Sequence, residues 1–195
     1  MTRLVGQRGF TLIELMMTIL VAAILMALAV PGFRTLTQNT QQRNAVSDLN
    51  AMLSRMRTEA AGRHLPVTAC VSTNQSSCSS ASTWESGWIL FVDGEPYVAG
   101  SSRNGSRDSG ETLIQAHAAL PSGVTLRTTG PTNVITLDAD GLPINASSGA
   151  STRATFRYCD ERGLSSLRAI VLGAGGIVRM VNDGKDHTGA VITSC

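Results

Sequence analysis

The sequence of 195 residues is poor in aromatic side chains and has no large excess of charge of one sign. Aromatic residues make up 4% of the chain, and 16 basic residues stand against 14 acidic ones, for a formal net charge of +2. A total so close to neutral does not indicate a strongly basic nucleic-acid-binding protein. Few aromatics, together with many glycine, serine and threonine residues, favour short strands, turns and loops over a helical bundle.

The sequence also lacks the short motifs of common enzyme classes. It has no phosphate-binding glycine loop of the Walker type and no serine in a Gly-x-Ser-x-Gly elbow. Residues 173–176 are rich in glycine, but they lie between two strand-like segments and are typical of a hairpin turn. We therefore expect no catalytic residues, no cofactor and no enzyme activity.

A metal site is not indicated either. His64, His117 and His187 are scattered along the chain, and no Cys-x-x-Cys pair is present. We expect His64 and His187 to be solvated and His117 to lie at a strand edge. Residues 138–141 and 182–186 carry oxygen ligands of the kind that calcium prefers, but neither segment matches a complete EF-hand loop. Hydrogen-bonded turns are the expected structure of both segments.

What the sequence does have is a long apolar run near its start. Residues 10–30 are apolar except for Thr11, Glu14 and Thr18, and Pro31 follows the run. About 20 consecutive apolar residues are enough to span the hydrocarbon core of a bilayer as a helix. The run therefore predicts a membrane-spanning helix.

A short basic leader precedes this run. It contains Arg3 and Arg8 and ends at Gly9, so that the rest of the chain has 14 basic and 14 acidic residues. The order differs from that of a secretory signal, in which the small-residue cleavage site follows the apolar stretch. Cleavage after Gly9 would leave the chain anchored by its own N-terminus. The positive leader predicts that this end stays cytoplasmic and that the remainder crosses the membrane outward.

Glu14 is the one carboxylate within the apolar run. Such a group costs several kcal/mol inside a membrane unless it is paired or lies near the interface, and it indicates a function by default. One interpretation is that Glu14 reaches the lipid headgroups, because it lies close to the start of the run. The other is that it pairs with a cation inside the membrane.

Beyond Pro31 the pattern becomes amphipathic. Apolar residues recur largely at spacings of three and four, at Phe33, Leu36, Val46, Leu49, Met52, Leu53, Met56 and Ala60. This one-sided stripe predicts a helix whose second half packs on a soluble domain. We expect one helix over residues 10–61, with a transmembrane half at 10–30, an amphipathic half at 31–62 and a stop at Gly62.

The remainder of the chain, residues 63–195, contains short β-branched runs separated by turn residues. The strand candidates are residues 65–71, 88–92, 112–117, 124–128, 134–137, 154–158, 167–172 and 177–181. The fold class that follows is α+β, with a long N-terminal helix packed on an antiparallel β-sheet domain.

The four cysteines all follow the apolar run, on the side expected to be oxidising. Cys70, Cys78, Cys159 and Cys195 form an even set, which indicates disulfides in an exported domain and permits three connectivities. We favour Cys70–Cys78, which closes a serine-rich loop, and Cys159–Cys195, which fastens the last residue.

The N-terminal segment resembles the processing site of type IV pilins and type II secretion pseudopilins. The residues that carry the resemblance are Gly9-Phe10-Thr11-Leu12-Ile13-Glu14-Leu15. The resemblance implies that a prepilin peptidase cuts between Gly9 and Phe10 and methylates the new amine of Phe10. It also implies that Glu14 neutralises the Phe10 amine of a neighbouring subunit, and that Pro31 bends one long helix rather than ending it.

Segments further along the chain resemble the GspH/FimT group of minor pilins and pseudopilins. They are residues 57–60, 66–70, 84, 87–93, 110–113 and 120–124, and the cysteine positions are closer to the FimT/FimU members. The resemblance covers most of the chain. It implies a minor pilin that helps to start a type IV pilus in a filament-tip complex. Its expected partners are the prepilin peptidase, other minor pilins, the major pilin and the inner membrane, with the β domain in the periplasm before assembly.

Two alternatives stay open. One is a pseudopilin of a type II secretion system. The other is a minor pilin that binds double-stranded DNA for transformation, because some FimT proteins use a basic Gly-Arg-x-Arg segment near the C-terminus. The matching residues here are 176–179, where Ile177 replaces the first arginine. Residues that could supply a basic surface are Arg162, Arg168, Arg179 and Lys185.

A pair of tryptophans could form a stacking platform for single-stranded nucleic acid. Trp84 and Trp88 flank Gly87, and exposed aromatic rings can stack on bases. Packing in the core is the interpretation we favour.

Overall fold

The computed structural model describes residues 9–80, 83–130, 133–181 and 184–195. The basic leader with Arg3 and Arg8 lies outside these residues. The chain forms two compact units, Met1–Thr40 and Gln41–Cys195, each of which is described by itself.

A single α-helix, α1 (Leu12–Arg63), runs through both units and continues through Pro31. The helix starts two residues later than predicted because Thr11 caps it, as described below. The expected stop at Gly62 is wrong, since Gly62 is still helical. The turn to the left-handed conformation is made by His64, with φ of 55°, and the Leu65 N–H donates to the Ala60 carbonyl at 3.3 Å. This is the hydrogen-bond pattern of a Schellman C-cap.

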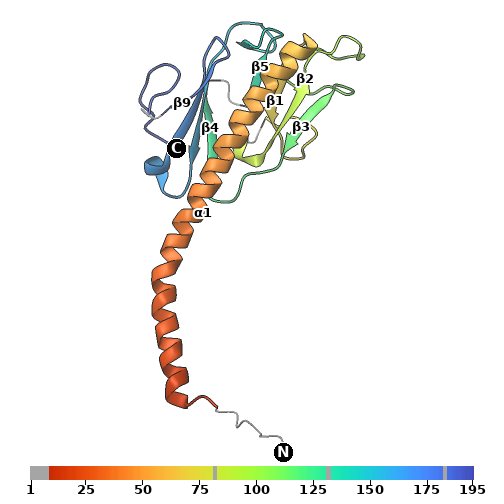
Figure 1. The fold of residues 1–195 in the computed structure, drawn as a ribbon. Helices are drawn as coiled ribbons and strands as arrows, with labels where there is room; N and C mark the ends of the chain where they lie inside the picture. The colour runs from red at the N-terminus through yellow and green to blue at the C-terminus, as the bar shows by residue number, and fades with distance from the viewer. Residues whose placement is uncertain (1–8, 81–82, 131–132, 182–183) are drawn as a thin grey trace, which may run out of the picture. The chain divides into compact units, whose positions relative to one another are not determined.

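The second unit contains the C-terminal part of α1 and two antiparallel sheets (Figure 1). The described strands are β1 (Val67–Val71), β2 (Trp88–Val92), β3 (Leu113–His117), β4 (Thr125–Thr129), β5 (Val134–Leu137), β6 (Pro143–Ile144), β7 (Ala154–Cys159), β8 (Arg168–Leu172) and β9 (Val178–Val181). The five-stranded sheet has the order β3-β2-β1-β5-β6, and the four-stranded sheet has the order β4-β7-β8-β9. The predicted α+β class is therefore confirmed.

Each of the eight predicted strands is present, with ends that differ by at most two residues. The structure also contains a ninth described strand, β6, which was not predicted from the sequence. It has two residues and begins with Pro143, and it exists because it pairs with β5 at the edge of the five-stranded sheet. Two short 3₁₀ helices, Trp84–Ser86 and Gly163–Ser166, were also not predicted.

The core lies between the helix and the sheets. Leu49, Met52, Leu53, Met56 and Ala60 are at most 2% exposed and form one face of α1. They share a cluster with residues of both sheets, so the predicted amphipathic stripe is buried from Val46 onward. Phe33 and Leu36, which belong to the same predicted stripe, are 71% and 62% exposed because they lie in the first unit, where no described sheet packs on the helix. Full burial of each large apolar side chain stabilises the fold by about 1.5–3 kcal/mol.

The two tryptophans belong to this core. Trp84 and Trp88 are each 1% exposed, and Trp84 packs edge-on against Phe156 with ring centroids 5.2 Å apart. Because neither ring face is accessible, the stacking-platform alternative is wrong. His117, at the end of edge strand β3, stacks on Trp88 with centroids 3.9 Å apart.

The hairpin predicted at residues 173–176 joins β8 to β9. The Gly173 N–H donates to the Ile177 carbonyl at 3.0 Å, and Gly176 N–H donates to the Gly173 carbonyl at 2.9 Å. Gly176 has φ of 69°, and a Cβ there would lie 2.1 Å from the Gly141 carbonyl oxygen. Glycine is thus required at this position on two counts, conformation and close approach.

The cysteines form the two disulfides that the sequence favoured. Cys70–Cys78 fastens the loop after β1, and Cys159–Cys195 joins the end of β7 to the last residue. The bridges close loops of different size, with sequence separations of 8 and 36.

Two polar side chains have surroundings that the sequence did not reveal. Asp93 is fully buried and accepts hydrogen bonds from the Thr68 hydroxyl at 2.6 Å and from the backbone N–H of Gly105 at 3.0 Å. Burial raises the pKa of the Asp93 carboxyl. His187, expected to be solvated, is half-buried and has Nδ1 3.0 Å from the hydroxyl of buried Thr155. His64 is exposed, as expected.

Candidate functional site

The segment around Gly9 and Phe10 lies outside the helix. Residues 9–11 have no regular secondary structure, and both Gly9 and Phe10 are exposed. A peptide bond must be drawn out of a helix before a protease can cleave it, and here the bond between Gly9 and Phe10 already meets that condition. The geometry therefore suits cleavage at the position that the sequence predicted.

The helix begins directly after this segment with a capping arrangement. Thr11 precedes the first helical residue, and its hydroxyl accepts a hydrogen bond from the Glu14 N–H at 3.3 Å. A threonine followed three residues later by a glutamate is a capping-box pattern, which satisfies a backbone donor that the helix leaves free. This role of Thr11 was not predicted, although the Thr-x-x-Glu spacing before an apolar run is a signal for it.

Glu14 stands out among the polar groups of the first helical turns. The Thr18 hydroxyl donates to the Leu15 carbonyl at 2.8 Å, so its polar group is satisfied inside the helix. The carboxylate of Glu14 is exposed, and it has no hydrogen-bond or ion-pair partner among the residues that the structure describes.

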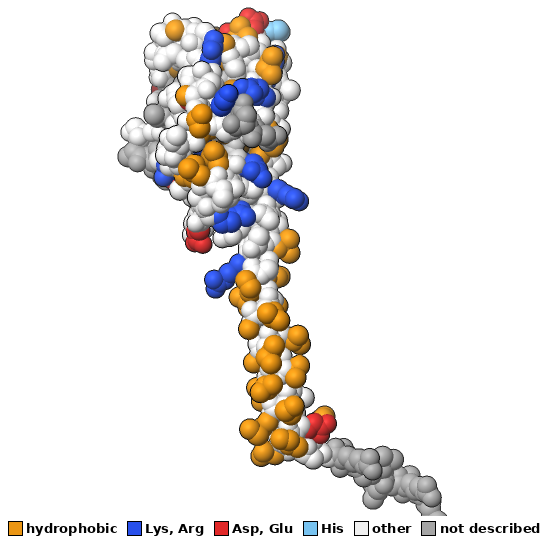
Figure 2. Space-filling view, turned by 90° about the vertical axis from the view of Figure 1, so that its left-hand side faces the viewer, with side chains coloured by type: hydrophobic (Ala, Val, Ile, Leu, Met, Phe, Trp, Pro, Cys, Tyr) orange, Lys and Arg blue, Asp and Glu red, His pale blue; other side chains and the backbone are white. Residues whose placement is uncertain are grey.

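The apolar side chains of the first unit are uncovered. Large apolar residues from Leu12 to Leu36 are at least half exposed, and one helix window is long and apolar enough to cross a membrane. Figure 2 shows hydrophobic side chains covering the visible face of this part of the helix. A helix that is apolar on all sides requires a lipid or helical environment.

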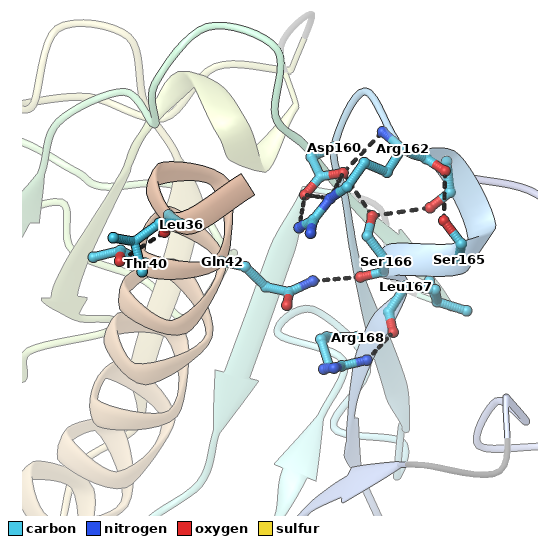
Figure 3. Close-up of polar contacts among 10 residues, drawn as sticks. Leu36, Thr40, Gln42, Asp160, Arg162, Ser165, Ser166, Leu167 and Arg168 are labelled. Carbon is cyan, nitrogen blue, oxygen red and sulfur yellow. Dashed lines mark hydrogen bonds and ion pairs between the residues drawn. The ribbon is translucent and has the colours of Figure 1, made fainter. Parts of the chain in front are cut away.

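The basic residues proposed for DNA contact do not form one surface. Arg162 is held by Asp160, with its Nη2 2.6 Å from Oδ2 and its Nε 3.0 Å from Oδ1 (Figure 3). The side-chain hydrogen bond from Arg162 is the largest cause that lowers the pKa of the Asp160 carboxyl to about 2. Much of the charge of Arg162 is therefore neutralised within the protein.

Arg168 and Arg179 point to opposite faces of the four-stranded sheet. Arg179 pairs in register with Val171, whose side chain belongs to a small cluster with Val181. Arg168 alternates with Ala169 on β8, and shares the helix side of the sheet with Ile170. Since alternate residues of a strand face opposite sides, one duplex cannot contact both arginines through one flat face. Lys185 is exposed in the segment after β9.

The described residues of the two oxygen-rich turns are hydrogen-bonded internally, and residues 182 and 183 of the second turn lie outside the described part of the chain. Asp138 Oδ1 accepts from the N–H groups of Asp140 and Leu142, and Asp186 Oδ1 accepts from the N–H and hydroxyl of Thr188. Within the described ranges, no three His, Cys, Asp or Glu side chains gather as metal ligands.

Comparison with known proteins assigns the family. Residues 45–176 match the model of "Type II transport protein GspH", and residues 5–30 match the "Prokaryotic N-terminal methylation motif". The first match covers most of the chain. The chain belongs to the GspH/FimT family of minor type IV pilins and pseudopilins.

Relatives agree with this membership. Two proteins described as "Fimbrial protein" from Pseudomonas aeruginosa are 46% identical to this chain over 47 residues, which is 24% of this chain and 30% of theirs. The match thus spans less than a third of the curated relatives. Two crystal structures of the minor pilin FimU from Pseudomonas aeruginosa are similar in fold, with TM-scores of 0.54 and 0.52 and 17% identity. The first alignment covers 82% of this chain and 98% of FimU, and the second covers 78% and 98%.

Membership of this family indicates how the N-terminal segment is processed and anchored. The methylation motif implies processing by a prepilin peptidase and assembly with other pilins. An apolar helix at the N-terminus of a minor pilin indicates membrane anchoring before assembly.

Proposed function

We propose that this protein is a minor pilin that helps to initiate a type IV pilus as part of a filament-tip complex. The prepilin peptidase cuts between Gly9 and Phe10 and methylates the amine of Phe10. The apolar half of α1 holds the processed chain in the inner membrane, and the β domain lies in the periplasm until the subunit enters the filament.

The observation that carries this proposal is the uncovered carboxylate of Glu14 on an otherwise apolar helix surface. Cleavage creates a positive amine on Phe10, four residues before Glu14 in the sequence. In a low-dielectric environment an unpaired carboxylate is costly, and pairing it with an amine of a neighbouring subunit removes much of that cost. Pairing between subunits therefore selects the correct axial register of one helix against the next.

Two features support a role for the β domain in assembly rather than catalysis. The domain is held by two disulfides and a closed core, and the carboxylates of Asp138 and Asp186 accept hydrogen bonds within their own turns. A rigid domain of this kind is suited to contact other minor pilins and the major pilin at the tip. We infer no cofactor.

The experiment that tests the proposal is a count of surface pili by electron microscopy in a strain that lacks the gene. Loss of pili, restored by a plasmid copy, supports initiation. The complementing copy with Glu14→Ala serves as the second arm, and we expect it to fail. Normal pili in the deletion strain would contradict a role in initiation.

The type II secretion alternative is favoured by one observation, the match to the GspH model. It predicts that the deletion strain keeps its pili and fails to export secreted enzymes. Measuring exported enzyme activity in the culture medium of the same strain separates the two functions.

A further inference from the structure

A groove in the second unit lies between α1 and the last strand of the four-stranded sheet. Its volume is about 280 Å³. Arg43 and Val46 of α1 line one side, and Arg168 and Met180 line the other. Met180 lies in β9 and is 59% exposed, so part of the groove surface is apolar and accessible to solvent.

The two arginines give the groove a positive charge. Arg43 and Arg168 are both exposed, and the Arg168 guanidinium donates a hydrogen bond of 3.0 Å to the Leu167 carbonyl (Figure 3). In the described part of the chain neither arginine has a carboxylate within ion-pair distance. Arg162, by contrast, is neutralised by Asp160.

The strand beside the groove is the edge of its sheet. β9 pairs with β8 and has no other strand partner in the described sheet. Gly173 and Ile177 form a hydrogen-bonded pair at the hairpin, and such pairs alternate along an antiparallel ladder. The backbone N–H and C=O groups of Val178 and Met180 therefore point outward, away from β8. An edge of this kind is a template for another strand.

We propose that this groove and the edge of β9 form a docking site for an extended, acidic segment of another protein. The segment pairs its backbone with Val178 and Met180 and adds a fifth strand to the sheet. Alternate side chains of the added strand turn toward α1, where apolar ones cover Met180 and carboxylates contact Arg43 and Arg168. Main-chain hydrogen bonds supply affinity in this mode, and the groove supplies specificity.

A peptide fits these features better than a nucleic acid does. Duplex binding requires several cations on one surface, whereas the groove has two arginines beside an exposed methionine. The outward N–H and C=O groups of β9 match the alternating donors and acceptors of a peptide backbone, which a phosphate backbone lacks. This proposal does not depend on the role in pilus initiation.

Binding is tested with the full chain in detergent micelles and fluorescein-labelled synthetic peptides. In the probe peptide every second residue is in turn valine or glutamate, with threonine between them, so that both kinds of side chain can face α1. A matched peptide carries lysine in place of glutamate. A third peptide carries N-methyl groups on the amides that would face β9. Fluorescence anisotropy at low salt measures the dissociation constants of all three.

We expect the valine–glutamate peptide to bind and the other two to bind at least about tenfold more weakly. Arg43→Glu and Arg168→Glu should each weaken binding of the acidic peptide by about tenfold or more, because each substitution replaces an attraction with a repulsion. Arg153→Glu is the matched control, since Arg153 is exposed elsewhere on the domain, and this variant should bind normally. Circular dichroism checks that each variant is folded.

Three results would overturn the proposal. The first is no binding of the acidic peptide to the folded wild type. The second is equal binding of the N-methylated peptide, which would exclude strand addition. The third is binding of duplex DNA in place of the peptide, with loss of that binding in the Arg43 and Arg168 variants. This result would show that the arginines contact the phosphates of DNA.

Discussion

Arg162 and Asp160 form a forked ion pair within the loop between β7 and β8, with Nη2 2.6 Å from Oδ2 and Nε 3.0 Å from Oδ1. Ser166 donates its hydroxyl to the same carboxylate at 2.7 Å, and its carbonyl accepts from the buried side chain of Gln42. This chain of contacts links α1 to the four-stranded sheet (Figure 3). Asp160 is its centre, since its carboxylate accepts from both partners.

Asp160→Asn should lower the free energy of unfolding by about 1–3 kcal/mol, the usual range for lost hydrogen bonds to a charged group. The amide cannot accept the forked contact of Arg162 and leaves the guanidinium without its counter-charge. Chemical denaturation of the full chain in micelles measures the effect. Glu161→Gln is the matched control, because Glu161 is the adjacent, exposed carboxylate, and this variant should change stability by less than about 0.5 kcal/mol. Equal stability of the Asp160 variant and wild type would contradict the assigned role.

The pH dependence of stability follows from the same carboxylate. Its pKa is 3.8 in the unfolded chain and about 2 in the folded protein, so the folded state favours the ionised form. The contribution of Asp160 is therefore fully present above about pH 4 and is lost as the pH falls toward 2. We expect the difference in stability between wild type and Asp160→Asn to shrink over that range. A difference that stays constant from pH 5 to about pH 2 would contradict the assignment.

Removal of the two disulfides should have unequal effects. In the chain-entropy description, a loop of separation 8 contributes about 2.5 kcal/mol and one of 36 about 3.8 kcal/mol. Cys159→Ser with Cys195→Ser should therefore lower the melting temperature more than Cys70→Ser with Cys78→Ser. Thermal unfolding of the two double variants makes the comparison. The opposite order would show that packing around Cys70 outweighs the loop entropy.

Gly9→Val should leave the leader on the protein and abolish assembly. The proposed cut follows Gly9, and a branched side chain at that position blocks the narrow approach that a protease needs. Mass spectrometry of membrane fractions measures the chain length and N-methylation. Gly6→Val is the matched control, because it adds the same side chain three positions earlier, and it should be processed normally. A processed Gly9 variant of normal length would contradict the cleavage site.

Glu14→Ala should spare processing and membrane insertion but reduce incorporation into filaments. The apolar helix is retained, whereas the carboxylate that neutralises a neighbouring Phe10 amine is absent. Immunoblots of sheared filaments and of membranes measure the two pools. Thr18→Ala, one turn further along the helix, is the control and should be incorporated normally. Full incorporation of the Glu14 variant would show that the carboxylate is dispensable.

Much of the fold could be predicted because its signals are local. The apolar run before Pro31 and the stripe from Leu49 to Ala60 each depend on spacing within one helix, and the structure contains both features in one continuous α1. The strands were recognised from short β-branched runs bounded by turn residues. The missed strand β6 had no such signal, since a pair of residues beginning with Pro143 is extended through its pairing with β5.

The candidate DNA surface could not be predicted from the sequence because it depends on which side of the four-stranded sheet each basic side chain points to. Arg168 and Arg179 lie on adjacent strands, yet strand register turns them to opposite sides. Arg162 lies in the same part of the chain, but Asp160 neutralises it through a loop conformation that no spacing rule reveals. The surroundings of Asp93 and His187 were hidden for the same reason, as their partners are distant in sequence.

The sequence by itself predicted an apolar helix long enough to span a membrane, a processing motif at Gly9 and Phe10 with Glu14 beside it, and the family, because each depends on the order of neighbouring residues. Only the tertiary structure decided which charges are paired and which remain exposed. It separated Arg168 from Arg179 and placed Arg168 beside Met180 in a groove of α1. Helix and strand signals act over a few residues, whereas charge pairing and grooves arise when distant segments pack together.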